Sequence, residues 1–162
     1  MTQTGVVVLM CGLPGSGKTG YARVLERQGY TRLSIDEEIW RRIGRDAADL
    51  DPAEYTRLQQ DAEARQWQEL IALLRARKPV VVDYSFASRA RRNRYRTLVA
   101  EHGGRCEIVY LKADLPTLRR RLAARNQLDG PNSVTVATDL LHRYAASFEE
   151  PCDEGERVIQ VS

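Results

Sequence analysis

The sequence predicts an α/β domain of three layers, in which a parallel sheet of about five strands lies between helices. Two observations predict this fold class. Short runs of β-branched and apolar residues alternate along the chain with segments of helical spacing. Strands separated by helices are joined by right-handed crossovers, which make the sheet parallel. The length of 162 residues suits one domain, 1–162, and 43% apolar against 29% charged residues fits a globular chain.

Five short segments are expected to form the strands. The first, 6–10, is a continuous apolar run between glycines, which is typical of a central strand buried on both faces. The other expected strands are 31–35, 80–82, 106–111 and 157–161.

Helical spacing and end signals define the segments between these strands. Ser88 and Asp114 are expected to cap helices, and Asp51-Pro52 marks a cap and first turn inside a longer helical stretch. Trp67, together with the leucines and isoleucine that follow it, lies on one apolar face, which predicts that this tryptophan packs in the core. The expected helices are 18–27, 37–77, 88–101, 114–125 and 135–148, and 127–133 is expected to be a loop.

A phosphate-binding loop follows the first strand. The residues from Gly12 to Thr19 match G-x-x-x-x-G-K-[ST] in full, directly after a buried strand and at the start of a helix. Glycines allow the backbone N–H groups to point inward and form an anion nest at the positive end of the helix dipole. Lys18 is expected to reach the β- and γ-phosphates and Thr19 to bind Mg²⁺. The other residues expected to hold the nucleotide are Gly12, Pro14, Gly15, Ser16 and Gly17.

Two carboxylates follow the second and third expected strands, at the edge of the sheet where ligands bind. Asp36 follows the second strand, where it can accept the proton of a substrate hydroxyl, or alternatively cap the next helix. Asp83 follows an apolar strand in the manner of a Walker B aspartate, where it can hold Mg²⁺ through water, or alternatively serve as a turn residue.

Two groups of arginines have a functional and a simpler interpretation. Arg121 and Arg125 share a helix face after the fourth strand, where they can neutralise charge on the transferred phosphoryl group as part of a lid, or form a solvated basic face. The segment 89–96 holds five arginines, of which Arg89 and Arg92 are candidate contacts to a polyanionic substrate. The alternative is an exposed helix face, and the net charge of +3 does not require a nucleic-acid partner.

With the phosphate loop, Asp36, Asp83 and the helix of Arg121 and Arg125 in this order, the chain resembles the small P-loop kinases. The resemblance is to the branch of AAA-type ATP-binding proteins and kinases similar to polynucleotide 5′-hydroxyl kinase domains, chloramphenicol phosphotransferase, gluconate kinase and zeta toxins. It implies a P-loop NTPase fold with a small helical lid at 115–135 and a substrate-covering segment at 37–78. That segment offers Trp40, Arg41, Arg42 and Tyr55 as candidate substrate contacts.

The resemblance implies an ATP- and Mg²⁺-dependent kinase that phosphorylates a hydroxyl of a small molecule, either a metabolite or an antibiotic. The alternatives are a polynucleotide 5′-hydroxyl kinase and a nucleotide-binding regulatory module with negligible turnover. Asp36 has no second carboxylate two residues on, so the D-x-D pattern of shikimate-type kinases is missing and that substrate class is disfavoured.

The remaining sequence features concern location. The longest apolar run, 6–11, is too short to span a membrane, and the N-terminus lacks the basic segment of a secretory leader. The three cysteines have no C-x-x-C spacing, so reduced thiols are expected. The sequence therefore predicts a cytoplasmic protein without a membrane partner, and it does not specify an oligomeric state.

Overall fold

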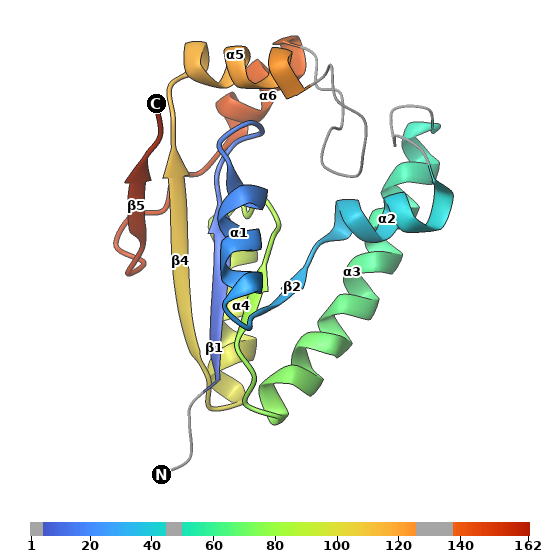
Figure 1. Ribbon diagram of the computed structural model, residues 1–162, viewed down its shortest axis with the longest axis vertical. Coiled ribbons are helices and arrows are strands. Elements are labelled where there is room, and N and C mark those ends of the chain that lie inside the picture. The colour runs from blue at the N-terminus through green and yellow to red at the C-terminus, as the bar shows by residue number, and fades with distance from the viewer. Residues whose placement is uncertain (1–4, 45–49, 126–137) are drawn as a thin grey trace.

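A computed structural model describes residues 5–44, 50–125 and 138–162 (Figure 1). The expected loop at 127–133, the end of the expected lid at 126–135 and the start of the expected last helix at 135–137 lie outside the described residues.

The sheet has five strands, all parallel, in the order β2-β3-β1-β4-β5. The predicted parallel sheet and the central place of its first strand are therefore confirmed. Val8 of that strand lies opposite Val81 on one side and Glu107 on the other. The strands are β1 (Val6–Cys11), β2 (Thr31–Leu33), β3 (Val80–Val82), β4 (Arg105–Lys112) and β5 (Arg157–Gln160).

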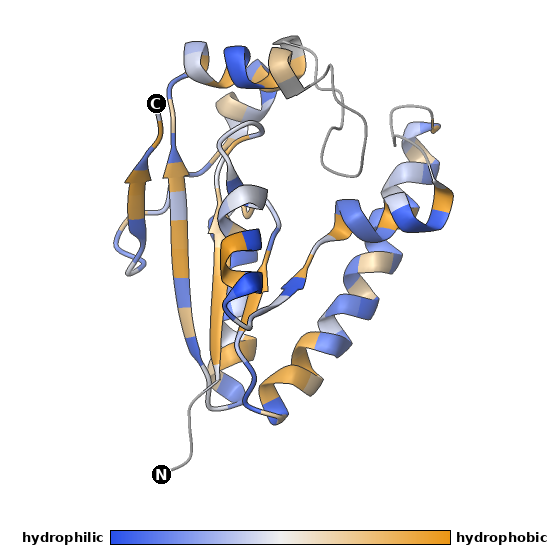
Figure 2. Ribbon diagram, in the orientation of Figure 1, coloured by the Kyte–Doolittle hydropathy of each residue, from blue (hydrophilic) through white to orange (hydrophobic). Residues whose placement is uncertain are grey.

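Helices cover both faces of the sheet. Successive side chains of a strand point to opposite faces, so an apolar strand presents apolar side chains on both. Val7 and Leu9 of β1 pack in a core shared with α3 and α4, whereas Val8 and Met10 pack in a core shared with α1. Figure 2 shows the hydrophobic strands between helices that carry polar residues. The three-layer prediction is confirmed. The helices are α1 (Lys18–Arg27), α2 (Ile35–Ile43), α3 (Pro52–Arg75), α4 (Arg89–Glu101), α5 (Leu115–Arg125) and α6 (Thr138–Ser147).

Two of the expected helix caps form as predicted. The Ser88 hydroxyl accepts a hydrogen bond from the amide of Arg91 at 3.1 Å, and the Asp114 carboxylate accepts one from the amide of Thr117 at 2.8 Å. Asp51 occupies the cap position of α3 with Pro52 in the first turn, but its side chain makes no capping hydrogen bond.

The region around Asp36 differs from the prediction. The second strand ends at Leu33 and not at residue 35, because Ser34 caps α2 by accepting a hydrogen bond from the amide of Glu37 at 3.2 Å. The helical stretch expected over 37–77 forms two helices, α2 and α3, and α3 begins at Pro52, where Asp51-Pro52 predicts a helix start. Gly44 ends α2 in the left-handed conformation. Asp36 therefore lies in the first turn of a helix and not at the end of a strand.

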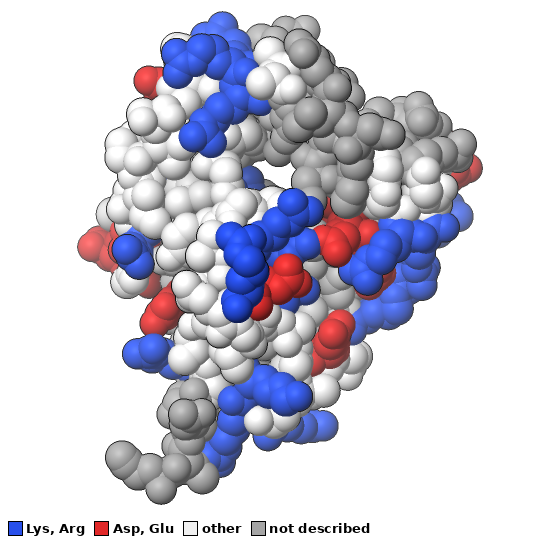
Figure 3. Space-filling model, viewed as in Figure 1, with Lys and Arg blue, Asp and Glu red and all other residues white. Residues whose placement is uncertain are grey.

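Charged side chains of both signs are interspersed on the face that includes α1 and α2, and a group of Lys and Arg side chains lies over α5 (Figure 3). Among the helices that the structure describes, none combines the length and the hydropathy needed to cross a bilayer.

Candidate active site

A cavity of about 750 Å³ opens at the carboxyl end of the sheet. This is the edge where ligands of open α/β sheets bind, and the volume is in the range of small-molecule sites. The phosphate loop lines one side of the cavity and side chains of α2 to α6 line the others. The lining residues used below are Lys18, Thr19, Asp36, Tyr55, Gln59, Asp83, Tyr84, Arg91, Arg121, Tyr144, Ser147 and Phe148.

The phosphate loop has the tight backbone that its glycines predict. Gly15 has φ +86°, and a Cβ added there would lie 3.1 Å from Cγ of Leu122 and 3.3 Å from the carbonyl oxygen of Leu118. A Cβ on Gly12 would lie 2.6 Å from Oγ of Ser16. The loop therefore packs closely beneath α5, and residues with side chains at these two positions would displace it.

The polar groups of this loop fit a phosphate. The Oγ atom of Ser16 is buried and has no hydrogen-bond partner among the described residues. The Nζ atom of Lys18 donates to the carbonyl oxygens of Gly12 at 2.9 Å and Leu13 at 3.0 Å, so the ammonium group lies across the loop. An unpaired buried hydroxyl costs free energy that an anionic ligand can recover, and a lysine held over an N–H nest adds the complementary charge.

Thr19 and Asp83 lie together as a pair that fits Mg²⁺. Thr19 Oγ1 donates to Asp83 Oδ2 at 3.1 Å, and the Asp83 side chain is only 3% exposed. A hydroxyl that donates to a carboxylate turns its lone pairs outward, where they can face a cation. Mg²⁺ needs only one or two protein ligands beside phosphate and water. The absence of a group of three or more His, Cys, Asp or Glu in the described parts of the chain is therefore compatible with a magnesium site.

Sequence reasoning missed Arg32, a third residue that contacts the Thr19–Asp83 pair. Arg32 of β2 is 4% exposed at its side chain and donates from Nη1 to Asp83 Oδ2 at 3.1 Å. It also forms an ion pair with Glu37. A buried charge requires a partner, so an arginine inside a predicted strand was the signal that a carboxylate lies beside it.

Asp36 lies on the cavity wall together with Tyr55 of α3. The Tyr55 hydroxyl donates to Asp36 Oδ1 at 3.2 Å. Burial, followed by the negative charge of Asp36, raises the pKa of Tyr55 above its ordinary value, so the phenol stays protonated and remains a donor. The structure therefore places a carboxylate whose orientation is held by a neighbouring hydroxyl on the cavity that the phosphate loop lines.

A buried glutamine joins the elements around Asp36. Gln66 of α3 donates from Nε2 to the carbonyl oxygen of Ser34 at 3.0 Å, and its Oε1 accepts the Tyr84 hydroxyl at 2.6 Å. These two bonds tie the start of α2 and the segment after β3 to the same helix.

Arg121 lies against the phosphate loop. A Cβ on Gly17 would be 3.4 Å from Nη1 of Arg121, and the arginine lines the cavity. Arg125 ends α5, and its side chain lies outside the described part of the chain.

Five other predicted substrate contacts do not line the cavity, namely Trp40, Arg41, Arg42, Arg89 and Arg92. Trp40 lies on α2 outside the lining, and the Arg41 side chain is 71% exposed and pairs with Glu37 at 3.5 Å. Arg92 is fully buried, and both Arg89 and Arg92 bind Glu154. The structure therefore pairs both arginines with a buried carboxylate. Arg92 faces the core from α4, whereas the Arg89 side chain is half exposed.

Several lining residues carry no signal in the sequence. Tyr144 and Ser147 come from the end of α6, Phe148 follows that helix and Gln59 comes from α3, and they meet only in the folded chain. Arg91, next to Arg92, also lines the cavity; its guanidinium lies 5.3 Å from the ring centre of Tyr84, and its Nη2 donates to Glu63 at 2.8 Å.

Comparison with known proteins places this site in a family. Residues 7–151 match the family model described as an AAA domain. A probable adenylyl-sulfate kinase of Aeropyrum pernix is 35% identical over 127 residues, which are 74% of this chain and 65% of that protein. The chain thus spans somewhat less than two thirds of that relative's length.

Solved structures share the fold at lower identity. A gluconokinase from Sinorhizobium meliloti has a TM-score of 0.66 at 21% identity, over 99% of this chain and 85% of that one. The Pnkp1/Rnl/Hen1 RNA repair complex has a TM-score of 0.69 at 19% identity, over 91% of this chain and 45% of that one. The chain belongs to the AAA domain family, in the P-loop kinase branch that its motifs predict.

Proposed function

We propose that this protein transfers the γ-phosphate of magnesium-bound ATP to a hydroxyl group of a small molecule. The observation that carries the proposal is that the phosphate loop and Asp36 line one cavity, with Tyr55 bound to the Asp36 carboxylate. A hydrolase needs only to orient water, whereas a carboxylate facing the terminal phosphate across a cavity suits an alcohol acceptor.

The nucleotide-binding side of the proposal rests on the loop and its neighbours. The backbone of the phosphate loop with Ser16 and Lys18 would hold the phosphates, and Thr19 with Asp83 would hold Mg²⁺, which supplies charge neutralisation when bound. Arg121, lying over Gly17, would stabilise negative charge that develops on the transferred group.

The proposed transfer assigns the proton to Asp36. The acceptor oxygen forms a bond to the γ-phosphorus while the bond from that phosphorus to the oxygen of the leaving ADP breaks, and Asp36 takes the hydroxyl proton. The Tyr55 hydroxyl holds the carboxylate in place on the cavity wall.

The walls around Asp36 suit an acceptor with a planar or apolar part. Tyr84, Tyr144 and Phe148 supply aromatic surface, and Arg91 supplies a guanidinium held by Glu63. The polynucleotide acceptor is not favoured, because all five arginines of 89–96 have partners within the protein. Arg89, Arg92 and Arg96 bind Glu154, Arg91 binds Glu63, and Arg94 stacks on Trp67 at 4.5 Å.

The test separates nucleotide binding from transfer. Wild-type protein is screened for ADP formation with a panel of hydroxyl compounds, namely sugar acids, nucleosides, aromatic alcohols and a 5′-hydroxyl oligonucleotide. With the best acceptor, Asp36→Asn is expected to bind ATP with wild-type affinity and to lose about 10²- to 10⁴-fold in kcat, the typical contribution of a general base. Asp61→Asn, an exposed aspartate of α3 outside the cavity, is the matched control. Transfer by Asp36→Asn at the wild-type rate would contradict the proposal.

A further inference from the structure

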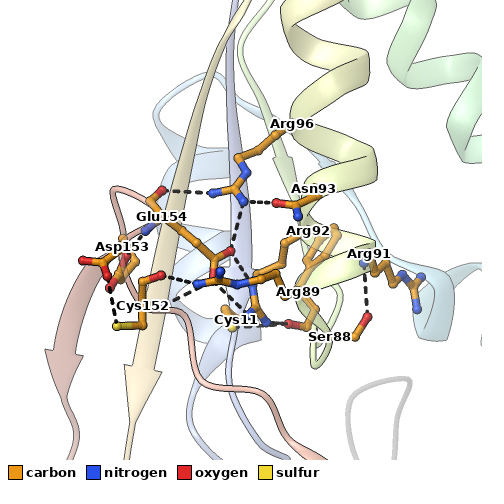
Figure 4. Close-up of polar contacts among 12 residues, drawn as sticks. Cys11, Ser88, Arg89, Arg91, Arg92, Asn93, Arg96, Cys152, Asp153 and Glu154 are labelled. Carbon is orange, nitrogen blue, oxygen red and sulfur yellow. Dashed lines mark hydrogen bonds and ion pairs between the residues drawn. The ribbon is translucent and has the colours of Figure 1, made fainter.

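A buried ion pair near Cys11, the residue before the phosphate loop, joins α4 to the segment between α6 and β5 (Figure 4). Arg92 is 0% exposed and donates from Nε and Nη2 to the two carboxylate oxygens of Glu154 at 2.9 and 3.1 Å. The Glu154 side chain is 2% exposed. It also pairs with Arg89 at 3.4 Å and Arg96 at 3.2 Å, and it accepts the amide of Cys152 at 3.3 Å.

The third donor of Arg92 reaches the segment that follows β3. Its Nη1 donates to the carbonyl oxygen of Phe86 at 2.7 Å, and the Cys11 thiol donates to the same oxygen at 3.4 Å. Phe86 has φ +47°, a left-handed conformation that is costly for a bulky side chain and persists only where the surroundings impose it. The Arg92 guanidinium is planar and rigid. The two hydrogen bonds from Nε and Nη2 to Glu154 therefore also fix the direction in which Nη1 donates to Phe86.

The Phe86 carbonyl belongs to the segment 83–87, which contacts both the phosphate loop and the chain that follows α6. Asp83, Tyr84 and Ser85, which precede Phe86, line the cavity, as does Ala87 after it. The Ser85 carbonyl accepts the amide of Gly12, the first residue of the phosphate loop, at 3.2 Å. The Ala87 carbonyl accepts the amide of Glu149, which follows the cavity residue Phe148, at 2.9 Å. A continuous series of contacts thus runs from Glu154 through Arg92 to the phosphate loop.

We propose that Arg92 and Glu154 are a positioning pair that holds residues 83–87, and through them the phosphate loop, in the geometry that binds nucleotide. The proposal rests on the proposed function only in that the cavity binds a nucleotide. A buried ion pair is weak support for stability, because apolar side chains of similar volume often stabilise a core equally well or better. Apolar side chains cannot supply the hydrogen bond to the Phe86 carbonyl, and this bond is what the pair contributes to the site.

The test removes the pair without leaving a buried charge. The double variant Arg92→Met/Glu154→Leu keeps the volume, and we expect it to unfold cooperatively near the wild-type melting temperature. Its dissociation constant for magnesium with a non-hydrolysable ATP analogue, measured by calorimetry, is expected to rise about tenfold, because a tenfold change in affinity corresponds to roughly the contribution of one hydrogen bond. Arg105→Met/Glu107→Leu, an exposed pair 3.0 Å apart on β4, is the matched control and is expected to bind like the wild type.

A second variant keeps the test decisive if the double variant does not fold. Arg92→Lys retains a cation for Glu154 but cannot hold Glu154 and the Phe86 carbonyl with one planar fork. We expect weaker nucleotide binding at a melting temperature close to that of the wild type. Wild-type affinity in Arg92→Lys, or in a folded double variant, overturns the proposal.

A nucleotide-independent measurement distinguishes this inference from the proposed function. The Gly12 amide, which donates to Ser85, is expected to exchange its hydrogen faster in Arg92→Lys than in the wild type and the control pair. Unchanged exchange overturns the positioning role. Failure of the proposed function would instead appear in the wild-type protein itself, as a lack of ATP binding or of phosphoryl transfer.

Discussion

Two arginines bring their charge into the interior, and each is compensated by a carboxylate beside the site. Arg32 binds Asp83, and Arg92 binds Glu154. Taking an ion out of water costs several kcal/mol, which a close, multiply hydrogen-bonded partner must offset. Arg32 binds Asp83, the first residue of the segment 83–87, and Arg92 donates to the Phe86 carbonyl within it, so both charge pairs help to hold this segment.

At the residue scale, the close approach of α5 to the phosphate loop at Gly15 can be tested by adding a Cβ there. Gly15→Ala is expected to weaken binding of the ATP analogue by at least about tenfold, because the new Cβ meets Leu122 and the Leu118 carbonyl and displaces the loop. Calorimetry measures the affinity.

Gly29 provides the matched control for that substitution. It has φ +103°, the same left-handed region, but nothing lies within 4 Å of its added Cβ. Gly29→Ala is expected to cost about 1–2 kcal/mol of stability, the price of left-handed backbone, and to leave nucleotide affinity unchanged. Equal nucleotide affinities in the two variants would contradict the packing argument.

At the element scale, the start of α4 depends on its cap. Ser88 accepts the amide of Arg91 at 3.1 Å, and the same first turn carries both the cavity residue Arg91 and the buried Arg92. The cap therefore begins the helix turn that carries one arginine into the cavity wall and the next into the core.

Ser88→Ala is expected to lower the free energy of unfolding by about 1 kcal/mol, the usual contribution of an N-cap side chain. Urea unfolding followed by circular dichroism measures the change. Thr97→Ala, at an exposed position of the same helix, is the control and is expected to be neutral or slightly stabilising, because alanine has the higher helix propensity. A cost for Thr97→Ala equal to that for Ser88→Ala would show that the loss does not come from the cap.

At the scale of the whole molecule, Glu154 links the C-terminal segment to the core. Burial alone would raise the pKa of Glu154, but hydrogen bonds from Arg92 and the Cys152 amide, together with the charges of Arg92 and Arg96, hold it below its ordinary value. A carboxylate with a lower pKa in the folded chain contributes stability above its unfolded pKa of about 4.3. That contribution is lost as the pH falls through the folded pKa.

The melting temperature is therefore expected to fall as the pH is lowered from about 5 to about 3, and to fall less steeply in Arg92→Met/Glu154→Leu. Thermal unfolding at a series of pH values measures both slopes. Glu101→Gln, at an exposed position at the end of α4, serves as the control and is expected to keep the wild-type slope. A double variant with the wild-type slope would show that Glu154 does not carry this pH dependence.

Predictions from the sequence succeeded where the signal is local. The run 6–10 and the glycines after it predict a buried strand followed by a phosphate loop, and both are found. The prediction for Asp36 was less accurate, because Ser34 competes for the cap and shortens the strand by two residues. The side chain of Asp36 still lines the cavity with Lys18.

The sequence by itself determined the order of strands and helices, the phosphate loop and the caps of α4 and α5, because dihedral preferences and neighbouring hydrogen bonds decide these features. Only the tertiary structure decided which charges serve the site. Arg91 and Arg92 are adjacent in the chain, yet one lines the cavity and the other is buried against Glu154, 62 residues away. Burial and ion pairing depend on surfaces that distant segments bring together, and no local pattern encodes those surfaces.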